Sequence, residues 1–281
     1  MARIIGGYFT SHVPGIGLAI AKGQKQDAYW RPFFDGLIPV QNWLNEKKPD
    51  VAIVFYNDHG LNFFLDTMPL FAVGAADVYH NDDEGWGLPV QQSFQGHPKL
   101  SWHIIECLVE DEFDVATCQK MKVDHAVVVP FQLAYPDAAS WPVKIIPIAI
   151  NTVQHPLPSA KRCLALGRAV RKALETWGGD EKIVVMGTGG LSHQLEGERA
   201  GFINKDYDLF CLDNLGPHPE ALTQHSPVEI VELSGSQGVE ILNWIAARGA
   251  LGLANPLQKH RNYHIPISNT AAATLLLEPA A

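Results

Sequence analysis

Short apolar runs recur along the chain and end abruptly in polar residues. The clearest run, residues 51–56, is rich in β-branched and aromatic side chains and stops at Asn57, Asp58 and His59. Runs of this length and composition predict buried strands. Comparable runs occupy residues 3–12, 144–150 and 182–186.

Between these runs, apolar residues return at helical spacing. Pro32 is expected near the start of the first helix, and Pro39 is expected to interrupt it. The last helix is expected to begin at a capping box in residues 234–237 and to stop at Gly249. The predicted helices cover residues 26–46, 97–110, 159–177 and 239–248.

Two stretches show neither the apolar runs of the strands nor the helical spacing of apolar residues. Residues 75–96 are rich in Asp, Gly and Asn and predict a long surface loop. The acidic cluster at 82–87 does not have EF-hand spacing, so we interpret it as a solvated loop. Residues 197–216 are mixed and also predict a loop. Pro147, inside a predicted strand, is expected at a sheet edge or a bulge.

Strands that alternate with helices predict an α/β fold. We expect one domain, residues 1–281, with a central mixed sheet and helices on both of its sides. No internal repeat or linker divides the chain. In open α/β sheets ligands bind beyond the carboxyl ends of the strands, so the active site is expected there.

Composition narrows the class of protein. The net charge of −9 and the lack of any basic run argue against a nucleic-acid partner. The chain shows no secretory leader and no run of about 20 apolar residues, so we expect no membrane span and a cytoplasmic location. Scattered cysteines without a CxxC pair fit free thiols in a reducing compartment. They are Cys107, Cys118, Cys163 and Cys211.

Several predicted strands deliver a histidine at their carboxyl ends. His12 follows the first strand and His59 the second, and parallel neighbouring strands would place these imidazoles side by side. His193 follows a glycine loop after residues 182–186. That loop lacks the third glycine of a dinucleotide fingerprint, and the chain has no GxSxG elbow. Each histidine alone also fits an ordinary loop position.

One acidic residue falls on an apolar helix face. At helical spacing Glu240 shares a face with Trp244 and Ala247. A buried carboxylate is costly unless it is paired or binds a metal, although a helix N-terminus also favours an acid. Together with His12 and His59 it forms a 2-His-1-carboxylate set. That set suits non-haem Fe(II) and equally a catalytic Zn²⁺, and spacing does not separate them.

A set of short motifs, in the same order along nearly the whole chain, resembles the class III extradiol ring-cleaving dioxygenases, and within them the catalytic β subunits of protocatechuate 4,5-dioxygenases. Each motif alone is weak, and together they are specific. The matching segments are Thr10-Ser-His-Val-Pro14, Tyr56-Asn-Asp-His59, Asp82-Asp-Glu-Gly-Trp-Gly87, Val123-Asp-His125, Gly187-Thr-Gly-Gly-Leu-Ser-His-Gln194, Gly197-Glu-Arg-Ala-Gly201, Gly238-Val-Glu240 and Ser268-Asn-Thr270.

The resemblance implies a cofactor and a reaction. His12, His59 and Glu240 would be ligands of Fe(II), and His193 the acid/base. The enzyme would use O₂ to open the ring of a carboxylated catechol, with protocatechuate going to 4-carboxy-2-hydroxymuconate semialdehyde. The resemblance also implies an α₂β₂ assembly with a separate small helical α subunit, because no part of this chain matches that subunit.

The resemblance further implies substrate contacts. His125 would lie near the bound substrate and oxygen, and Ser268 and Asn269 near the substrate carboxylate. By its position alone, Asp58 fits either a group that orients a ligand imidazole or a plain turn residue. Three other interpretations remain open: a related enzyme for gallate or 3-O-methylgallate, a zinc hydrolase on the same ligands, and a non-catalytic binding subunit.

Overall fold

A computed structural model describes residues 2–280, except for the side chain of Pro266. Its centre is an eight-stranded sheet in the order β6-β3-β7-β2-β8-β1-β10-β9. Strands β1, β8, β2 and β7 run parallel, whereas β3, next to β7, and β10, next to β1, run antiparallel to them. The predicted mixed sheet is therefore confirmed. The strands are β1 (Arg3–Thr10), β2 (Val51–Tyr56), β3 (Phe71–Gly74), β6 (Ala116–Cys118), β7 (Lys144–Ile150), β8 (Lys182–Thr188), β9 (Leu257–Ile267) and β10 (Thr270–Glu278).

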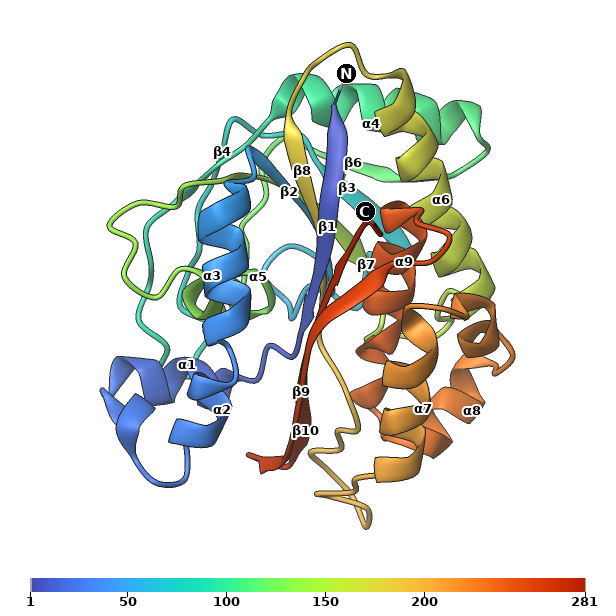
Figure 1. The fold of residues 1–281 in the computed structure, drawn as a ribbon. Coiled ribbons are helices and arrows are strands. Elements are labelled where there is room, and N and C mark those ends of the chain that lie inside the picture. The colour runs from blue at the N-terminus through green and yellow to red at the C-terminus, as the bar shows by residue number, and fades with distance from the viewer. Residues whose placement is uncertain (1, 281) are drawn as a thin grey trace.

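Helices cover both faces of this sheet (Figure 1). One face carries α4 (Pro98–Glu110), α6 (Ala160–Thr176), α7 (Lys205–Leu215), α8 (Pro227–Ser234) and α9 (Ile241–Leu251). The other carries α1 (Pro14–Ala21), α2 (Arg31–Asp35), α3 (Ile38–Lys47) and α5 (His125–Ala134). A separate small sheet joins β4 (Val78–Tyr79) to β5 (Phe94–Gln95).

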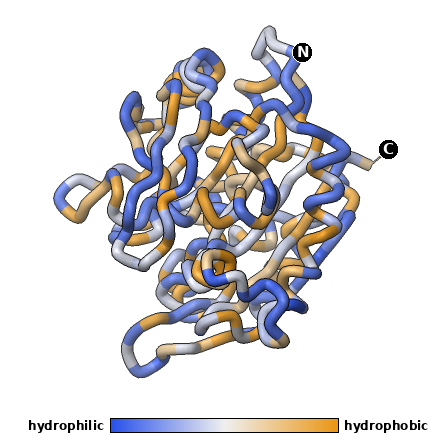
Figure 2. Tube along the Cα trace, turned by 90° about the vertical axis from the view of Figure 1, so that its left-hand side faces the viewer, coloured by the Kyte–Doolittle hydropathy of each residue, from blue (hydrophilic) through white to orange (hydrophobic). Residues whose placement is uncertain are grey.

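Strand β2 is buried on both of its faces, which explains why its sequence is apolar at every position. All six of its residues are buried, and successive side chains point to opposite faces. Val51, Ile53 and Phe55 join the core beneath α6 and α9, whereas Ala52 and Val54 join the core beneath α3 and α5. Figure 2 shows apolar segments gathered at the centre of the trace and hydrophilic segments at many of its outer turns. Within residues 2–280, no helix combines the length and apolarity needed to cross a bilayer.

Two predicted helices have different boundaries. The expected interruption at Pro39 is confirmed, because α2 and α3 are separate helices and Pro32 and Pro39 each lie in the first turn of their helix. Only the start differs: Gln26 belongs to a short turn, Gln24–Gln26, that precedes α2. The predicted capping box at 234–237 is wrong. Ser234 ends α8, and its hydroxyl donates to the carbonyl of Ile230.

The end of the chain's last helix was also misplaced. A 3₁₀ turn, Gly238–Glu240, leads into α9, which continues through Gly249 and stops at Gly252, where φ is 64°. A glycine tolerates this left-handed conformation, which is why it ends the helix.

Two further expectations are corrected. Residues 197–216, predicted as loop, contain α7, because the side chain of Asn204 caps its first turn by accepting from the N–H of Tyr207. Pro147 lies in β7, an interior strand and not an edge. The sheet tolerates it because the β3 ladder pairs only residues 148–150 of β7.

Candidate active site

The carboxyl ends of β1, β8 and β2 bring the predicted histidines together. His12 follows β1 and His59 lies just beyond β2, and their ring centroids are 5.2 Å apart. The expectation that their strands are neighbours is wrong, because β8 lies between them. The imidazoles still meet because β1, β8 and β2 are parallel, so the segments that follow them begin at the same edge of the sheet. His193 follows the middle strand, so all three residues come from adjacent strand ends.

Polar groups outside the cluster fix the orientation of the imidazoles of His12 and His59. Nδ1 of His12 lies 3.1 Å from the hydroxyl of Thr188. Nδ1 of His59 lies 2.9 Å from Oδ2 of Asp124, which also accepts the backbone N–H of His59 at 2.7 Å. With Nδ1 engaged on the outside, Nε2 of each ring faces inward, as metal-binding histidines require.

Glu240 closes the cluster between the two rings. It is only 4% exposed. Its Oε2 lies 3.4 Å from Nε2 of His12, and its Oε1 lies 3.5 Å from Nε2 of His59. Oε1 accepts from the side-chain amide of Asn57 at 3.1 Å, and Oε2 accepts from the backbone N–H of Gly190 at 2.8 Å. The inward carboxylate expected from the helix pattern is therefore present, and two donors orient it.

The charges of these groups depend on one another. Burial opposes ionisation of Glu240, but the imidazoles of His12 and His59 outweigh it and hold the pKa of Glu240 well below its usual range. Burial likewise opposes charge on His59, yet the carboxylates of Asp124 and Glu240 hold its pKa well above the ordinary value. The pKa of Asp124 is lowered to about 2, because His59 outweighs the effect of burial. Carboxylates that stay ionised although they are buried are typical of a site that binds a positively charged group.

Of the two roles that the sequence left open for Asp58, the structure shows the turn residue. Asp58 accepts the backbone N–H groups of Gly60, Asn62 and Phe63, so it shapes the turn after β2. Asp124 orients His59 instead, from 65 residues further along the chain. Its position in the Val123-Asp-His125 segment was the available signal.

His125 reaches the same cluster from the other side of the sheet. It is the first residue of α5, which Asp124 caps. Ligand atoms of His12, His59 and His125 lie within 4.8 Å of one another. Burial, together with the nearby His59, lowers the pKa of His125 well below its usual value.

A residue from the acidic cluster, Glu84, contacts His125. Nδ1 of His125 lies 2.5 Å from Oε2 of Glu84. The interpretation of residues 82–87 as simply solvated is therefore corrected. Burial raises the pKa of the Glu84 carboxyl to about 7.

The imidazole of His193 is available to a ligand, whereas its main chain is held in place. Its main chain is anchored, because its N–H donates to Ser234 and its carbonyl accepts from Gln237 and Gly238. Among the described residues, no side chain hydrogen-bonds its imidazole, which is 9% exposed. Burial lowers its pKa. A neutral imidazole beside the cluster suits proton transfer at neutral pH.

These groups line a cavity of about 260 Å³ whose other walls are mainly apolar. Ser268 lines it, whereas Asn269 is not among its described lining residues. Both occupy the turn between β9 and β10 and have positive φ. The cavity is lined by His12, Val13, Pro14, Gly15, Leu18, His59, Trp86, His125, His193, Leu195, Gln237, Glu240 and Ser268.

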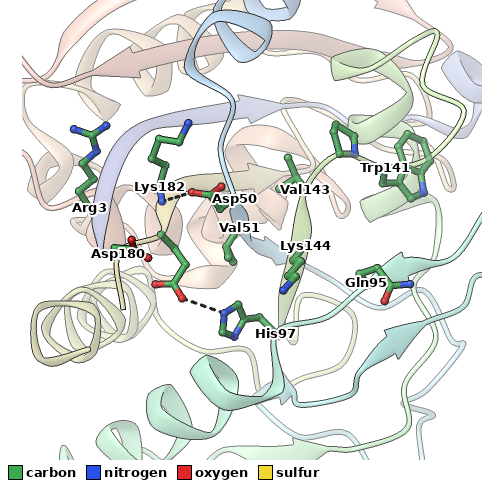
Figure 3. Close-up of a pocket in the computed structure, with 12 residues that line it drawn as sticks. Arg3, Asp50, Val51, Gln95, His97, Trp141, Val143, Lys144, Asp180 and Lys182 are labelled. Atoms are coloured by element: carbon green, nitrogen blue, oxygen red, sulfur yellow. Dashed lines mark hydrogen bonds and ion pairs between the residues drawn. The ribbon is translucent and has the colours of Figure 1, made fainter. Parts of the chain in front are cut away.

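A larger cavity, of about 970 Å³, opens at the opposite, amino-terminal ends of the strands and contains none of these groups. Figure 3 shows its basic and acidic side chains interleaved, and the backbone N–H of Lys182 donates a hydrogen bond to the carboxylate of Asp50. His97 and Glu181 form an ion pair there, with Nε2 3.2 Å from Oε1. Charges of both signs balance among the lining residues, and no group of metal-binding side chains converges there within residues 2–280.

Fold and site define a class of protein: an α/β domain with a His-rich, carboxylate-containing cluster at strand ends. The family model for the catalytic LigB subunit of aromatic ring-opening dioxygenases matches residues 6–274. The chain therefore belongs to that family, which confirms the extradiol resemblance at the level of family.

Similar curated proteins carry two kinds of name. A gallate dioxygenase from Pseudomonas putida is 42% identical over 183 residues, which are 65% of this chain and 53% of that protein. A 2,3-dihydroxyphenylpropionate/2,3-dihydroxicinnamic acid 1,2-dioxygenase from Photorhabdus laumondii is 26% identical over 95% of both chains. A protein of the same name from a Mycobacterium species is 33% identical over 66% of this chain and 55% of its own length. This chain thus spans about half of the gallate dioxygenase it matches.

Proposed function

We propose that this chain is the catalytic subunit of an Fe(II)-dependent extradiol dioxygenase that opens the ring of a carboxylated catechol. The convergence of His12, His59 and Glu240 on one point carries the proposal. Family membership over residues 6–274 supports the same reaction class.

The residues fit a metal ion. Nε2 of His12 is buried and has no hydrogen-bond partner among the described residues, and an orphaned lone pair beside a carboxylate is expected where a cation binds. Two imidazole nitrogens and one carboxylate leave half of an octahedron open, which is the ligand set of non-haem Fe(II) oxygenases. His12, His59 and Glu240 would hold the ion, and His125 would stay beside it.

Bound Fe(II) would supply the redox chemistry between a catechol and O₂ that Zn²⁺ cannot provide. The chain's own groups do the rest. His193, neutral and open, accepts a proton from a substrate hydroxyl and later returns it. His125 lines the same cavity and would face the reacting ring beside His59. The apolar walls, including Leu18 and Leu195, hold the ring and exclude water.

The substrate is a carboxylated catechol, with protocatechuate and gallate as the two candidates. The motif resemblance favours protocatechuate, and the 42% identity to a gallate dioxygenase favours gallate equally. In either case the hydroxyl of Ser268, at the cavity, is a suitable donor to the substrate carboxylate. Asn269 would assist from the same turn.

A separate small helical α subunit, in an α₂β₂ assembly, is part of the proposal. Trp86 and Leu195 line the cavity, yet they are 51% and 44% exposed. Large apolar side chains that rim a cavity are typical of a surface that another chain covers. Co-purification with a small subunit, and higher turnover in its presence, would support this assembly.

A zinc-dependent hydrolase is the alternative from another class, because the same ligands also hold catalytic Zn²⁺. Metal content after purification and oxygen uptake separate the two readily. A hydrolase would retain zinc and consume no oxygen.

The deciding experiment loads the chain anaerobically with Fe(II) and then adds O₂ with protocatechuate, gallate, 3-O-methylgallate or 2,3-dihydroxyphenylpropionate. We expect stoichiometric O₂ uptake and a yellow ring-opened product with protocatechuate or gallate. The Glu240→Gln variant, treated identically, is the matched control. No uptake with any of these compounds, with or without a small partner subunit, would overturn the proposal.

A further inference from the structure

One carboxylate in the acidic cluster turns inward while its neighbours face solvent. The side chain of Glu84 is 7% exposed, compared with 49% for Asp82. Both of its oxygens contact one residue: Oε1 accepts the backbone N–H of His125 at 2.7 Å, and Oε2 lies 2.5 Å from Nδ1 of the same residue. These short contacts span 41 residues of sequence.

This contact selects which ring nitrogen of His125 carries the proton. Burial raises the pKa of the Glu84 carboxyl to about 7, so above that pH the group is ionised. An ionised carboxylate accepts hydrogen bonds and has none to donate, so Nδ1 of His125 is then the protonated nitrogen. The backbone N–H that Glu84 also accepts lies at the positive end of α5, which favours the ionised carboxylate. Nε2 is then a bare acceptor on the side of the ring that faces His12 and His59.

We propose that Glu84 is a positioning residue, which keeps the proton on Nδ1 of His125 and presents Nε2 to the substrate as a hydrogen-bond acceptor. The inference deepens the proposed function and rests on it for the identity of the substrate. His125 lines the cavity, and its ring centroid lies 4.2 Å from that of His59. A fixed tautomer matters there, because the two tautomers offer opposite hydrogen-bonding groups at Nε2.

A simpler role for Glu84 is to cap the first turn of α5. The variant Glu84→Gln separates the two roles. Its single amide oxygen still accepts the backbone N–H of His125, so the cap is kept. Its NH₂ group lies against Nδ1 and donates to it, which forces the proton onto Nε2. Capping alone therefore predicts no change of tautomer, and the positioning role predicts an inversion.

The test is ¹⁵N NMR of the histidine side chains in the full chain without metal, at a pH above the pKa of Glu84, with the His125 signals identified by their loss in His125→Gln. We expect Nδ1 to be protonated in the wild type and Nε2 in Glu84→Gln. In the Fe(II)-loaded enzyme we expect kcat to fall about 10–100-fold, the range for groups that orient functional histidines, with KM within about threefold. Asp82→Asn, which removes a charge from the same cluster without touching His125, is the matched control.

A wild-type ring protonated at Nε2, or a Glu84→Gln ring still protonated at Nδ1, would overturn the inference. So would a loss of turnover in Asp82→Asn equal to that in Glu84→Gln. The NMR readout needs no turnover. Failure of the proposed reaction in the wild type would therefore leave the tautomer result intact, and the two failures are distinguishable.

Discussion

The two ends of the parallel strands make an instructive pair. Both ends carry charged side chains and a cavity, and the amino-terminal cavity is the larger, at about 970 Å³ against 260 Å³. At the amino end, the described charged side chains form an ion pair, bond to backbone groups or face solvent. At the carboxyl end, His12, His59 and Glu240 are buried or half-buried and aim at one point.

The difference shows that the active site is recognised by side chains that converge on one point, and not by the volume of its cavity. Buried polar groups are costly unless something satisfies them. At the amino end, the ion pair of His97 with Glu181 already satisfies both partners. At the carboxyl end, Nε2 of His12 finds no hydrogen-bond partner within the part of the chain that the structure describes. Only the second arrangement calls for a ligand.

The largest expected effect is loss of the metal. His12→Ala, His59→Ala and Glu240→Gln each remove one of three proposed ligands, so we expect no retained iron and no turnover. Elemental analysis after gel filtration measures this, with circular dichroism to confirm folding. Full iron occupancy with turnover in any one variant would remove that residue from the ligand set.

The next effect leaves the metal in place. His193→Gln keeps the size of the side chain but cannot take up a proton at neutral pH. We expect iron content equal to that of the wild type and turnover lower by about 10²–10⁴-fold, the contribution of general acid–base catalysis. Steady-state oxygen uptake measures it, and wild-type rates would rule out the assigned role.

A smaller effect is expected from the group that orients a ligand. Asp124→Asn can still cap α5 but weakens the contact with Nδ1 of His59, so metal affinity should fall about 10–100-fold. Competition titration against a chelating dye measures the affinity. Asp58→Asn, in the turn after β2, is the control and should leave affinity unchanged. Equal losses in both variants would show that the turn matters and the imidazole contact does not.

The smallest effect belongs to the amino end. The pKa of Glu181 is lowered: burial opposes this, and hydrogen bonds, including those from Trp177 and His97, outweigh it. A depressed pKa contributes stability above the unfolded value of about 4.5, and that contribution is lost as pH falls through the folded pKa. Glu181→Gln should therefore lower stability by about 1 kcal/mol or less at pH 7 and by nothing at low pH.

Urea unfolding at both pH values measures the Glu181 effect, and metal content and turnover should match the wild type. A loss of activity in this variant would connect the two ends of the sheet and break the contrast between them.

Local pattern was enough for much of the fold. The strands β1, β2, β7 and β8 coincide with apolar runs, because a strand buried on both faces needs apolar side chains at every position. Helices were predicted less well where a local signal was ambiguous. Ser234 resembled a helix start but ends α8, and Asn204, an ordinary cap in a mixed stretch, starts α7.

The sequence by itself determined which strands end in histidines and that a carboxylate lies on an apolar helix face, because these are properties of short segments. Only the tertiary structure decided which of these groups meet. Strand order puts β8 between the strands of His12 and His59. Asp124 and Glu84 reach their imidazoles across 65 and 41 residues. Such partners are chosen by the packing of distant segments, and no spacing along the chain encodes that choice.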